Sequence, residues 1–261
     1  MTTCFSPAAL PIVCKDAQQS KNQPKQPVLR IVSYNIRHGE GMDGKIDLKR
    51  IADVIAREKP DLVALQEVDR NCQRSGNRDS VKELGVLLNM DYRFGKAIDF
   101  QDGEYGNAVL SRLPILDTIR HSLPAGGEPR CALEVKVQVE GVSVPVSFIC
   151  LHTDPYDESV RAKQVQALLD ALRDTSNPTI LAGDFNGEKT DASLKKFEAP
   201  EWLILEKGGK KTFPSNDPKI EIDFFILRGF PNTTIQHDVI DERMASDHRP
   251  ISAAITFATI P

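Results

Sequence analysis

Short β-rich apolar runs alternate with amphipathic helical stripes along most of this chain, and this rhythm limits the folds that it can adopt. The run Val28 to Ile36 precedes apolar residues spaced at i, i+3, i+4 and i+7, which predict a helix over Asp47 to Arg57. Leu62 to Leu65 is the next strand-like run. The order returns later in the chain, where a helix predicted over Asp157 to Arg173 precedes a strand over Thr179 to Ala182.

The remaining elements are shorter. Arg130 to Glu140 alternates apolar and polar residues, and with Val142 to Leu151 it predicts an antiparallel hairpin. Helices are also expected around Val81 to Leu88 and over Ala192 to Phe197. Further strands are expected at Tyr92 to Ile98, Ala108 to Leu110, Ile115 to Ile119, Ile222 to Leu227, Thr234 to Ile240 and Ile251 to Phe257.

Two sheets packed face to face, each covered by helices on its outer side, would bury all of these apolar stripes. No linker separates the two halves, and 261 residues suit one α/β domain. The sequence therefore predicts an α/β (α+β) fold with a single domain over residues 28–261.

Residues 1–27 differ from the rest of the chain. Ala8 to Cys14 is weakly apolar, and Lys15 to Pro27 is polar and rich in Gln, Lys and Pro. We expect a disordered tail, or the remnant of an export signal that lacks its basic region. Cys131 and Cys150 lie in apolar strand-like runs, which favours buried free thiols.

Composition excludes some functions. The chain is 40% hydrophobic and 27% charged, as is ordinary for a soluble protein. Its formal net charge of −4 argues against broad, charge-driven binding of nucleic acid. No apolar run approaches the ~18–20 residues of a membrane span. We expect a soluble monomer, cytoplasmic or exported, in which Lys207, Lys210 and Lys211 lie in a solvated loop and His121 and His237 lie on the surface.

Polar residues recur where the predicted strands end, and strand ends are where loops converge over a rigid scaffold. These residues are Asn35, Glu67, His152, Asp184, Asn186, Asp223, Asp247 and His248. Carboxylate and carboxamide oxygens are hard donors that suit Mg²⁺ or Mn²⁺. Imidazoles suit proton transfer near neutral pH, and Asp223 is a candidate partner for one of them. The set suggests a metal-dependent phosphoesterase.

Seven phrases resemble, in order, the successive motifs of the endonuclease/exonuclease/phosphatase superfamily, whose fold is DNase I-like. They are Ser33-Tyr34-Asn35-Ile36-Arg37, Leu65-Gln66-Glu67-Val68-Asp69, Gly106-Asn107-Ala108-Val109-Leu110-Ser111-Arg112, Leu151-His152-Thr153, Gly183-Asp184-Phe185-Asn186, Ile222-Asp223-Phe224 and Ser246-Asp247-His248-Arg249-Pro250. The resemblance covers about residues 28–257 and implies a four-layer α/β/β/α sandwich with a metal at one open edge of the paired sheets.

The resemblance also implies roles for the site residues. Glu67 would be the principal metal ligand, with Asn35 and Asp247 near the ion. Asp184 and Asn186 would hold or activate the water and contact the phosphate. These assignments imply a cofactor, Mg²⁺ or Mn²⁺, and a metal-activated water that attacks phosphorus.

Both imidazoles take part in the implied chemistry. His152 would stabilise developing charge on the phosphate or protonate the leaving oxygen, while His248, oriented by Asp223, would be the base. Whether Asp184 or His248 takes the water's proton is left open. Arg37 and Tyr105 are weaker candidates for phosphate contact. Arg37 stands where related AP endonucleases carry an acidic ligand, and Tyr105 lies one residue from the tyrosine that some family nucleases use.

The sequence thus predicts a divalent-metal-dependent hydrolase of phosphate esters, of phosphodiesterase or phosphatase type. Its substrate could be a small molecule, a lipid-derived ester or a nucleic acid, so an endonuclease or exonuclease acting on DNA or RNA is the first alternative. A non-catalytic binding module that retains the fold is an alternative of another class.

Overall fold

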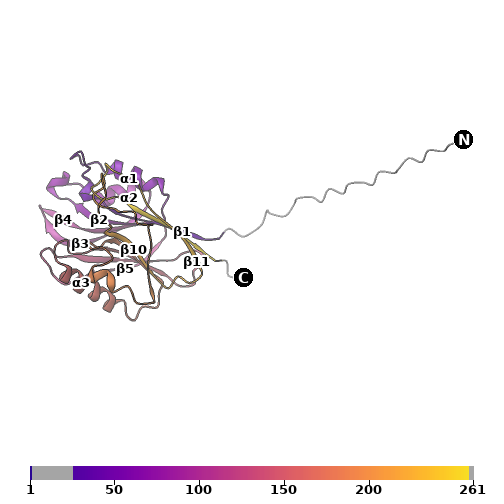
Figure 1. Cartoon of the computed structure of the whole chain (residues 1–261). Helices are drawn as coiled ribbons and strands as arrows, with labels where there is room; N and C mark the ends of the chain where they lie inside the picture. Colours follow the sequence, from indigo (N-terminus) through magenta and orange to yellow (C-terminus); the bar gives the residue numbers. More distant parts are fainter. Residues whose placement is uncertain (2–25, 259–261) are drawn as a thin grey trace.

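Two six-stranded sheets stack face to face, with α-helices covering the outer side of each, in a computed structural model that describes Met1 and residues 26–258. Figure 1 shows α1 and α2 on one side of the stacked sheets and α3 on the other. The predicted four-layer α/β/β/α sandwich is therefore confirmed. The proposed tail or signal remnant over residues 1–27 lies almost entirely outside the described residues.

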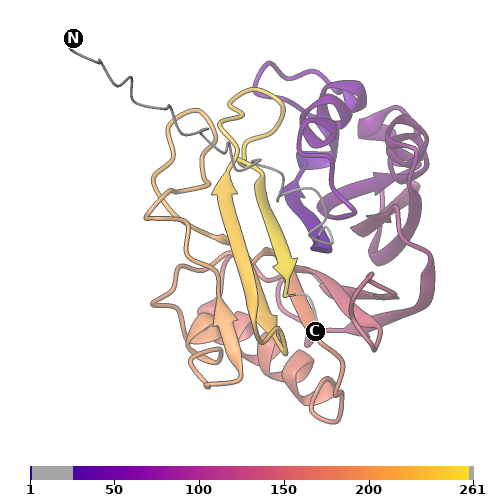
Figure 2. The same ribbon diagram turned by 90° about the vertical axis from the view of Figure 1, so that its right-hand side faces the viewer.

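The first sheet joins both ends of the folded chain. In spatial order it contains β11 (Thr233–Val239), β12 (Ile251–Phe257), β1 (Val28–Asn35), β2 (Leu62–Arg70), β4 (Gly103–Ser111) and β3 (Asp91–Phe100). β1 pairs with β12 in antiparallel fashion and with β2 in parallel. Figure 2 shows the two C-terminal strands crossing the turned molecule. The outer face of this sheet packs on α1 (Leu48–Arg57) and α2 (Ser80–Leu88).

The second sheet is built from the middle of the chain. In spatial order it contains β5 (Ile115–Ser122), β6 (Cys131–Val137), β7 (Val146–His152), β8 (Thr179–Asp184), β10 (Asp223–Arg228) and β9 (Trp202–Ile204). β6 and β7 form the predicted antiparallel hairpin, while β7 and β8 are parallel. Its outer face packs on α3 (Glu158–Ala171) and α4 (Ala192–Lys195).

Each of these four α-helices begins after an aspartate whose side chain accepts a hydrogen bond from a backbone N–H of the first turn. The aspartates are Asp47, Asp79, Asp157 and Asp191. Such a cap satisfies a donor that has no partner within the helix and contributes about 1 kcal/mol. The start of each of these helices is therefore encoded in the local sequence. Two short 3₁₀ turns, Arg37–Gly39 and Gln73–Ser75, complete the helical segments.

The principal core lies between the sheets, where apolar residues from both inner faces meet. Leu133, Phe148 and Phe225 lie in it and are at most 1% exposed. Cys131 and Cys150 are buried free thiols, as predicted. Among the described residues, no helix has the length and apolarity needed to cross a membrane.

Candidate active site

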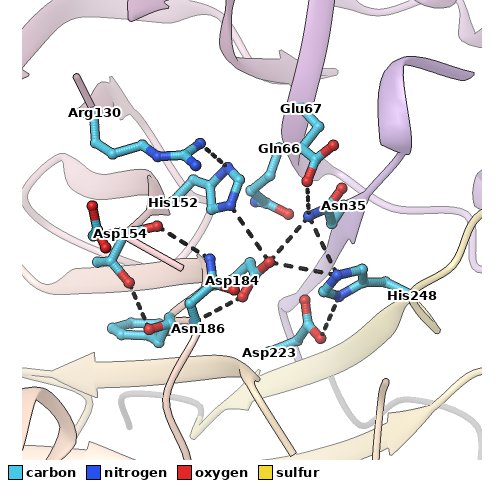
Figure 3. Close-up of polar contacts among 12 residues, drawn as sticks. Asn35, Gln66, Glu67, Arg130, His152, Asp154, Asp184, Asn186, Asp223 and His248 are labelled. Atoms are coloured by element: carbon cyan, nitrogen blue, oxygen red, sulfur yellow. Dashed lines mark hydrogen bonds and ion pairs between the residues drawn. The ribbon is translucent and has the colours of Figure 1, made fainter. Parts of the chain in front are cut away.

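Strand register brings the predicted site residues together at one edge of the sandwich. In the second sheet, Asp184 at the end of β8 lies directly opposite His152 on the parallel strand β7 and opposite Asp223 on β10. In the first sheet, Asn35 ends β1 opposite Gln66, the residue before Glu67. Figure 3 shows the side chains from both sheets converging on Asp184.

Asp184 lies at the centre of the cluster and is 1% exposed. Its Oδ2 accepts a hydrogen bond from Asn35 Nδ2 at 3.0 Å and lies 3.6 Å from Nε2 of both His152 and His248. Its Oδ1 accepts the backbone N–H of Asn186 at 2.8 Å. Burial raises the pKa of this carboxyl and the nearby Asp223 adds to the rise, while His248 opposes it.

His248 and Asp223 form a buried pair beside Asp184. His248 Nδ1 lies 3.0 Å from Asp223 Oδ2, and the two residues are 5% and 2% exposed. Burial alone would lower the pKa of His248, but the carboxylates of Asp223 and Asp184 raise it above its usual range. The pairing predicted from sequence is therefore present in the structure.

His152 lies on the opposite side of Asp184 in a different environment. Its Nδ1 faces the guanidinium of Arg130, with Nη1 at 3.0 Å. Burial lowers the pKa of His152, and the positive charges of Arg130 and His248 lower it further. The pKa values of the two imidazoles are thus shifted in opposite directions although the rings flank the same oxygen.

Glu67 lies at an irregularity in the pairing of β2 with β4, between Leu65 and Val68, where its φ is +57°. Its Oε1 accepts a hydrogen bond from Asn35 Nδ2 at 3.0 Å, and no other hydrogen bond to its carboxylate is found among the described residues. The irregular backbone turns Gln66 inward, toward Ser33 and Cys150, and leaves the Glu67 side chain at the edge of the sheet.

Asp247 supplies a second, partly exposed carboxylate in the loop before β12. Its Oδ1 lies 3.3 Å from Ser246 Oγ, and its Oδ2 lies 3.7 Å from Nε of Arg37. Asn35 connects this region to Asp184, because its Oδ1 accepts the Arg37 backbone N–H at 3.1 Å while its Nδ2 donates to the carboxylates. Glu67 and Asp247 therefore offer oxygen donors of the kind that Mg²⁺ or Mn²⁺ takes.

Asp184, Asp223 and His248 are also close enough to share an ion, since one ligand atom from each lies within 4.8 Å of the others. Their polar atoms are already engaged with one another, however, and Asn35 donates a hydrogen bond into the group. This arrangement suits the handling of a proton better than the ligation of a metal.

Asn186 adopts a left-handed conformation with φ of +47° two residues after the end of β8. Its Nδ2 donates to the backbone oxygen of Thr153 at 3.1 Å, which fixes the amide beside His152. Gly183 is needed for this geometry, because a Cβ at that position would lie 1.9 Å from the backbone oxygen of Leu151. Close approach of β8 to β7 therefore positions Asp184 and Asn186.

The weaker candidates lie at the periphery. Arg37 is partly exposed and contacts Glu40 at 3.3 Å in addition to Asp247. Tyr105 is 7% exposed, and its hydroxyl lies 3.4 Å from Nη1 of Arg130. Burial and the charge of Glu67 raise the Tyr105 pKa above its usual range, so the phenol stays protonated.

Two basic residues at the site were not found from sequence. Arg130 lies directly before β6 and belongs to none of the seven motifs. The solvated-loop interpretation is wrong for Lys207, which is 3% exposed and donates from Nζ to the Asp223 backbone oxygen at 2.8 Å.

The surface interpretation is also wrong for His121 and His237. His121 Nε2 lies 2.8 Å from the buried Glu134, and both ring nitrogens of His237 are buried.

A sandwich of two six-stranded sheets with this cluster at one edge is the DNase I-like architecture. The chain belongs to the endonuclease/exonuclease/phosphatase family, whose model matches residues 32–248. The resemblance inferred from the seven motifs is confirmed. Members of this family are hydrolases that act on phosphate esters.

Individual relatives are distant. The uncharacterized protein YbhP of Escherichia coli K12 is 24% identical over 250 residues, which cover 90% of this chain and 98% of YbhP. Solved structures that share the fold are similarly distant in sequence. A functionally unknown conserved protein of Enterococcus faecalis has a TM-score of 0.74 at 21% identity, with 88% of this chain and 100% of that chain covered. The Bacteroides thetaiotaomicron mannosyl-6-phosphatase has a TM-score of 0.70 at 18% identity, with the same coverage.

Proposed function

We propose that this protein is a divalent-metal-dependent hydrolase of phosphate esters, of phosphatase or phosphodiesterase type. The observation that carries the proposal is the convergence on Asp184 Oδ2 of one amide donor at 3.0 Å and two imidazole nitrogens at 3.6 Å. Glu67, which shares the Asn35 amide with Asp184, and Asp247 would provide oxygen ligands. A buried acceptor, two imidazoles and hard metal ligands are the parts that phosphoryl transfer to water requires.

Glu67 and Asp247 would hold Mg²⁺ or Mn²⁺, with Asn35 between the ion and Asp184. The ion would polarise a phosphoryl oxygen and neutralise charge in the transition state. Asn35 donates to both Glu67 and Asp184, so it sets the spacing of the metal ligands from the proton acceptor. Arg37 contacts Asp247 and would meet the substrate phosphate.

Asp184 would orient the attacking water and accept its proton, since it is the acceptor toward which the other groups point. His248 is held through Nδ1 by Asp223, and its Nε2 would stabilise the carboxyl group of Asp184. His152 and Asn186 lie on the other side of Asp184 and would contact the phosphate. Such preorganised donors act where charge develops, and removal of one costs about 10²–10³-fold in kcat.

The direct test is hydrolysis of a panel of phosphomonoesters, phosphodiesters and oligonucleotides with Mg²⁺ or Mn²⁺. Glu67→Gln, Asp184→Asn and His248→Ala should each lower kcat/KM by at least about 100-fold. Asp53→Asn, on the exposed side of α1, is the matched carboxylate control and should retain wild-type activity. Wild-type rates in all three site variants would refute the proposal, and inactivity on every substrate with no bound divalent ion by calorimetry would favour a binding module.

The oligonucleotide arm of the panel tests the nuclease alternative. Neutralisation of phosphates by Lys and Arg makes nucleic-acid binding steeply dependent on salt. The net charge of −4 favours a small or lipid-derived ester instead. Rates on oligonucleotides that exceed those on small esters and fall steeply between 50 and 200 mM salt, a range in which such binding weakens by orders of magnitude, would assign the protein to the nucleases.

A further inference from the structure

Arg130 lies directly behind His152 and is 7% exposed. Its Nη1 is 3.0 Å from His152 Nδ1, 3.4 Å from the Tyr105 hydroxyl and 3.1 Å from Glu128 Oε1. Figure 3 shows its guanidinium reaching the imidazole from the side opposite Asp184. Neither the motifs nor the proposed chemistry gives this residue a role.

The contact between Arg130 and His152 determines where the imidazole carries its proton. A guanidinium has donors only and stays charged in proteins. The nitrogen that faces Nη1 at hydrogen-bond distance must therefore offer a lone pair, so Nδ1 of His152 is unprotonated. The ring is then neutral, and its one N–H is at Nε2, which lies 3.6 Å from Asp184 Oδ2.

His248 provides the internal comparison. It faces the same Asp184 oxygen through Nε2 at the same 3.6 Å, but its Nδ1 contacts the carboxylate of Asp223. A carboxylate is an acceptor, so Nδ1 of His248 carries a proton. The two imidazoles of the site are thus set in opposite ways by their outer partners, a guanidinium for His152 and a carboxylate for His248.

We propose that Arg130 is a positioning residue that holds His152 as a neutral imidazole with its N–H at Nε2, on the side of Asp184, where it is available to the phosphoryl oxygen of a substrate bound there. His152 would then stabilise charge on that oxygen by donating a hydrogen bond, and would not deliver a proton to the leaving group. Tyr105 and Glu128 contact the same Nη1 that faces His152 and hold it in place. The catalytic part of this inference rests on the proposed function, whereas the tautomer does not.

The tautomer is measured on the resting protein by long-range ¹H–¹⁵N correlation of its five histidines at pH 7.5. His152→Gln assigns the His152 signals. We expect Nδ1 of His152 to show the shift of an unprotonated nitrogen and Nε2 that of a protonated one. A proton on Nδ1, or on both nitrogens, would overturn the proposal whether or not the protein hydrolyses any ester.

Variants of Arg130 test whether its guanidinium fixes the tautomer of His152. Arg130→Met removes the donor and should leave His152 as a mixture of tautomers, while Arg130→Lys keeps a cationic donor and should keep the proton at Nε2. Arg173→Met, at an exposed position just after α3, is the control and should change nothing. An unchanged His152 spectrum in folded Arg130→Met would overturn the role of Arg130. If Arg130→Met does not fold, the spectra of the wild type and of Arg130→Lys still test the proposed tautomer of His152.

Kinetics on the best substrate of the panel distinguish positioning of His152 by Arg130 from direct binding of the substrate phosphate by Arg130. Outer partners that orient a site residue typically matter by about 10–100-fold, so Arg130→Met should lower kcat by that factor with little change in KM, and Arg130→Lys should recover part of it. A rise in KM at unchanged kcat would contradict a positioning role and would indicate direct phosphate binding. If no ester of the panel is hydrolysed but His152 shows the expected tautomer, the result would count against the proposed function and not against the role of Arg130.

Discussion

His237 on β11 has both ring nitrogens buried, with no hydrogen-bond partner among the described residues, and its ring lies against Phe225 with centroids 5.3 Å apart. Burial, helped by the charge of Lys207, lowers its pKa from the ordinary 6.5 to about 3. In the unfolded chain His237 therefore takes up a proton as the pH falls below 6.5, whereas in the folded protein it does so only at about pH 3. The contribution of His237 to the free energy of unfolding therefore decreases as the pH is lowered from about 6.5 to about 3.

His237→Leu should remove this contribution and avoid the burial of two unpaired nitrogens. The loss of unfolding free energy between pH 7 and pH 5, measured by urea denaturation, should be smaller in the variant than in the wild type. Gln236→Leu, at the exposed neighbouring position, should keep the wild-type pH dependence. Equal pH dependence in His237→Leu and wild type would contradict the account.

Lys207 shows how one buried cation supports the site. Its Nζ lies 2.5 Å from Glu221 Oε1, donates to the Asp223 backbone oxygen and lies 4.1 Å from the centre of the Phe224 ring. Loss of one partner of a buried ion pair leaves the other charge uncompensated, which costs about 3 kcal/mol. Lys207→Met should destabilise the protein by this order in urea denaturation, and Glu221→Leu in the same chain should restore part of it.

Lys210→Met is the matched control, because the Lys210 side chain is 55% exposed in its pair with Asp238. Exposed pairs contribute about 0–1 kcal/mol, so this variant should stay near the wild type. Similar losses for Lys207→Met and Lys210→Met would show that burial of Lys207 matters little. Sequence could not separate the two lysines, because both lie in one polar stretch and only the tertiary contact with β10 distinguishes them.

At the scale of elements, sequence identified most helices and strands because their apolar spacing is local information. The helix predicted over Asp47 to Arg57 and the hairpin of β6 and β7 are both present. The strand β9, Trp202–Ile204, was missed, since three residues carry no alternation. Glu134, one of the polar positions in the alternating run Arg130 to Glu140, is buried against His121 and Ser147. Which strands become neighbours depends on crossovers that no local pattern records.

The parallel pairing of β7 with β8 is the element on which the site depends most. Gly183→Ala would place a Cβ 1.9 Å from the Leu151 backbone oxygen, so the strands must separate. We expect a loss of about 2 kcal/mol in unfolding free energy, with reduced activity because His152 and Asp184 lie on the two strands. Gly127→Ala is the control, since its Cβ would meet nothing within 4 Å. Equal stability of the two variants would contradict this role for Gly183.

For the whole molecule, the site exists only where the two sheets meet. Asn35 and Glu67 come from the first sheet, whereas His152, Asp184 and Asp223 come from the second. Sequence predicted each of these residues because it falls at a strand end within a recognisable motif. It did not predict Arg130, which lies directly before β6, because the role of this residue follows from its contact with His152 on β7 and not from any spacing along the chain.

Metal dependence tests the central claim most directly. The protein is stripped with EDTA, dialysed and titrated with Mn²⁺ while hydrolysis of its best phosphate ester is followed, for the wild type and for Glu67→Gln. The account predicts no hydrolysis without added ion, recovery of the wild type on titration, and a requirement for at least about tenfold more Mn²⁺ in Glu67→Gln. Full hydrolysis by the stripped protein, or identical Mn²⁺ curves for the two proteins, would contradict it.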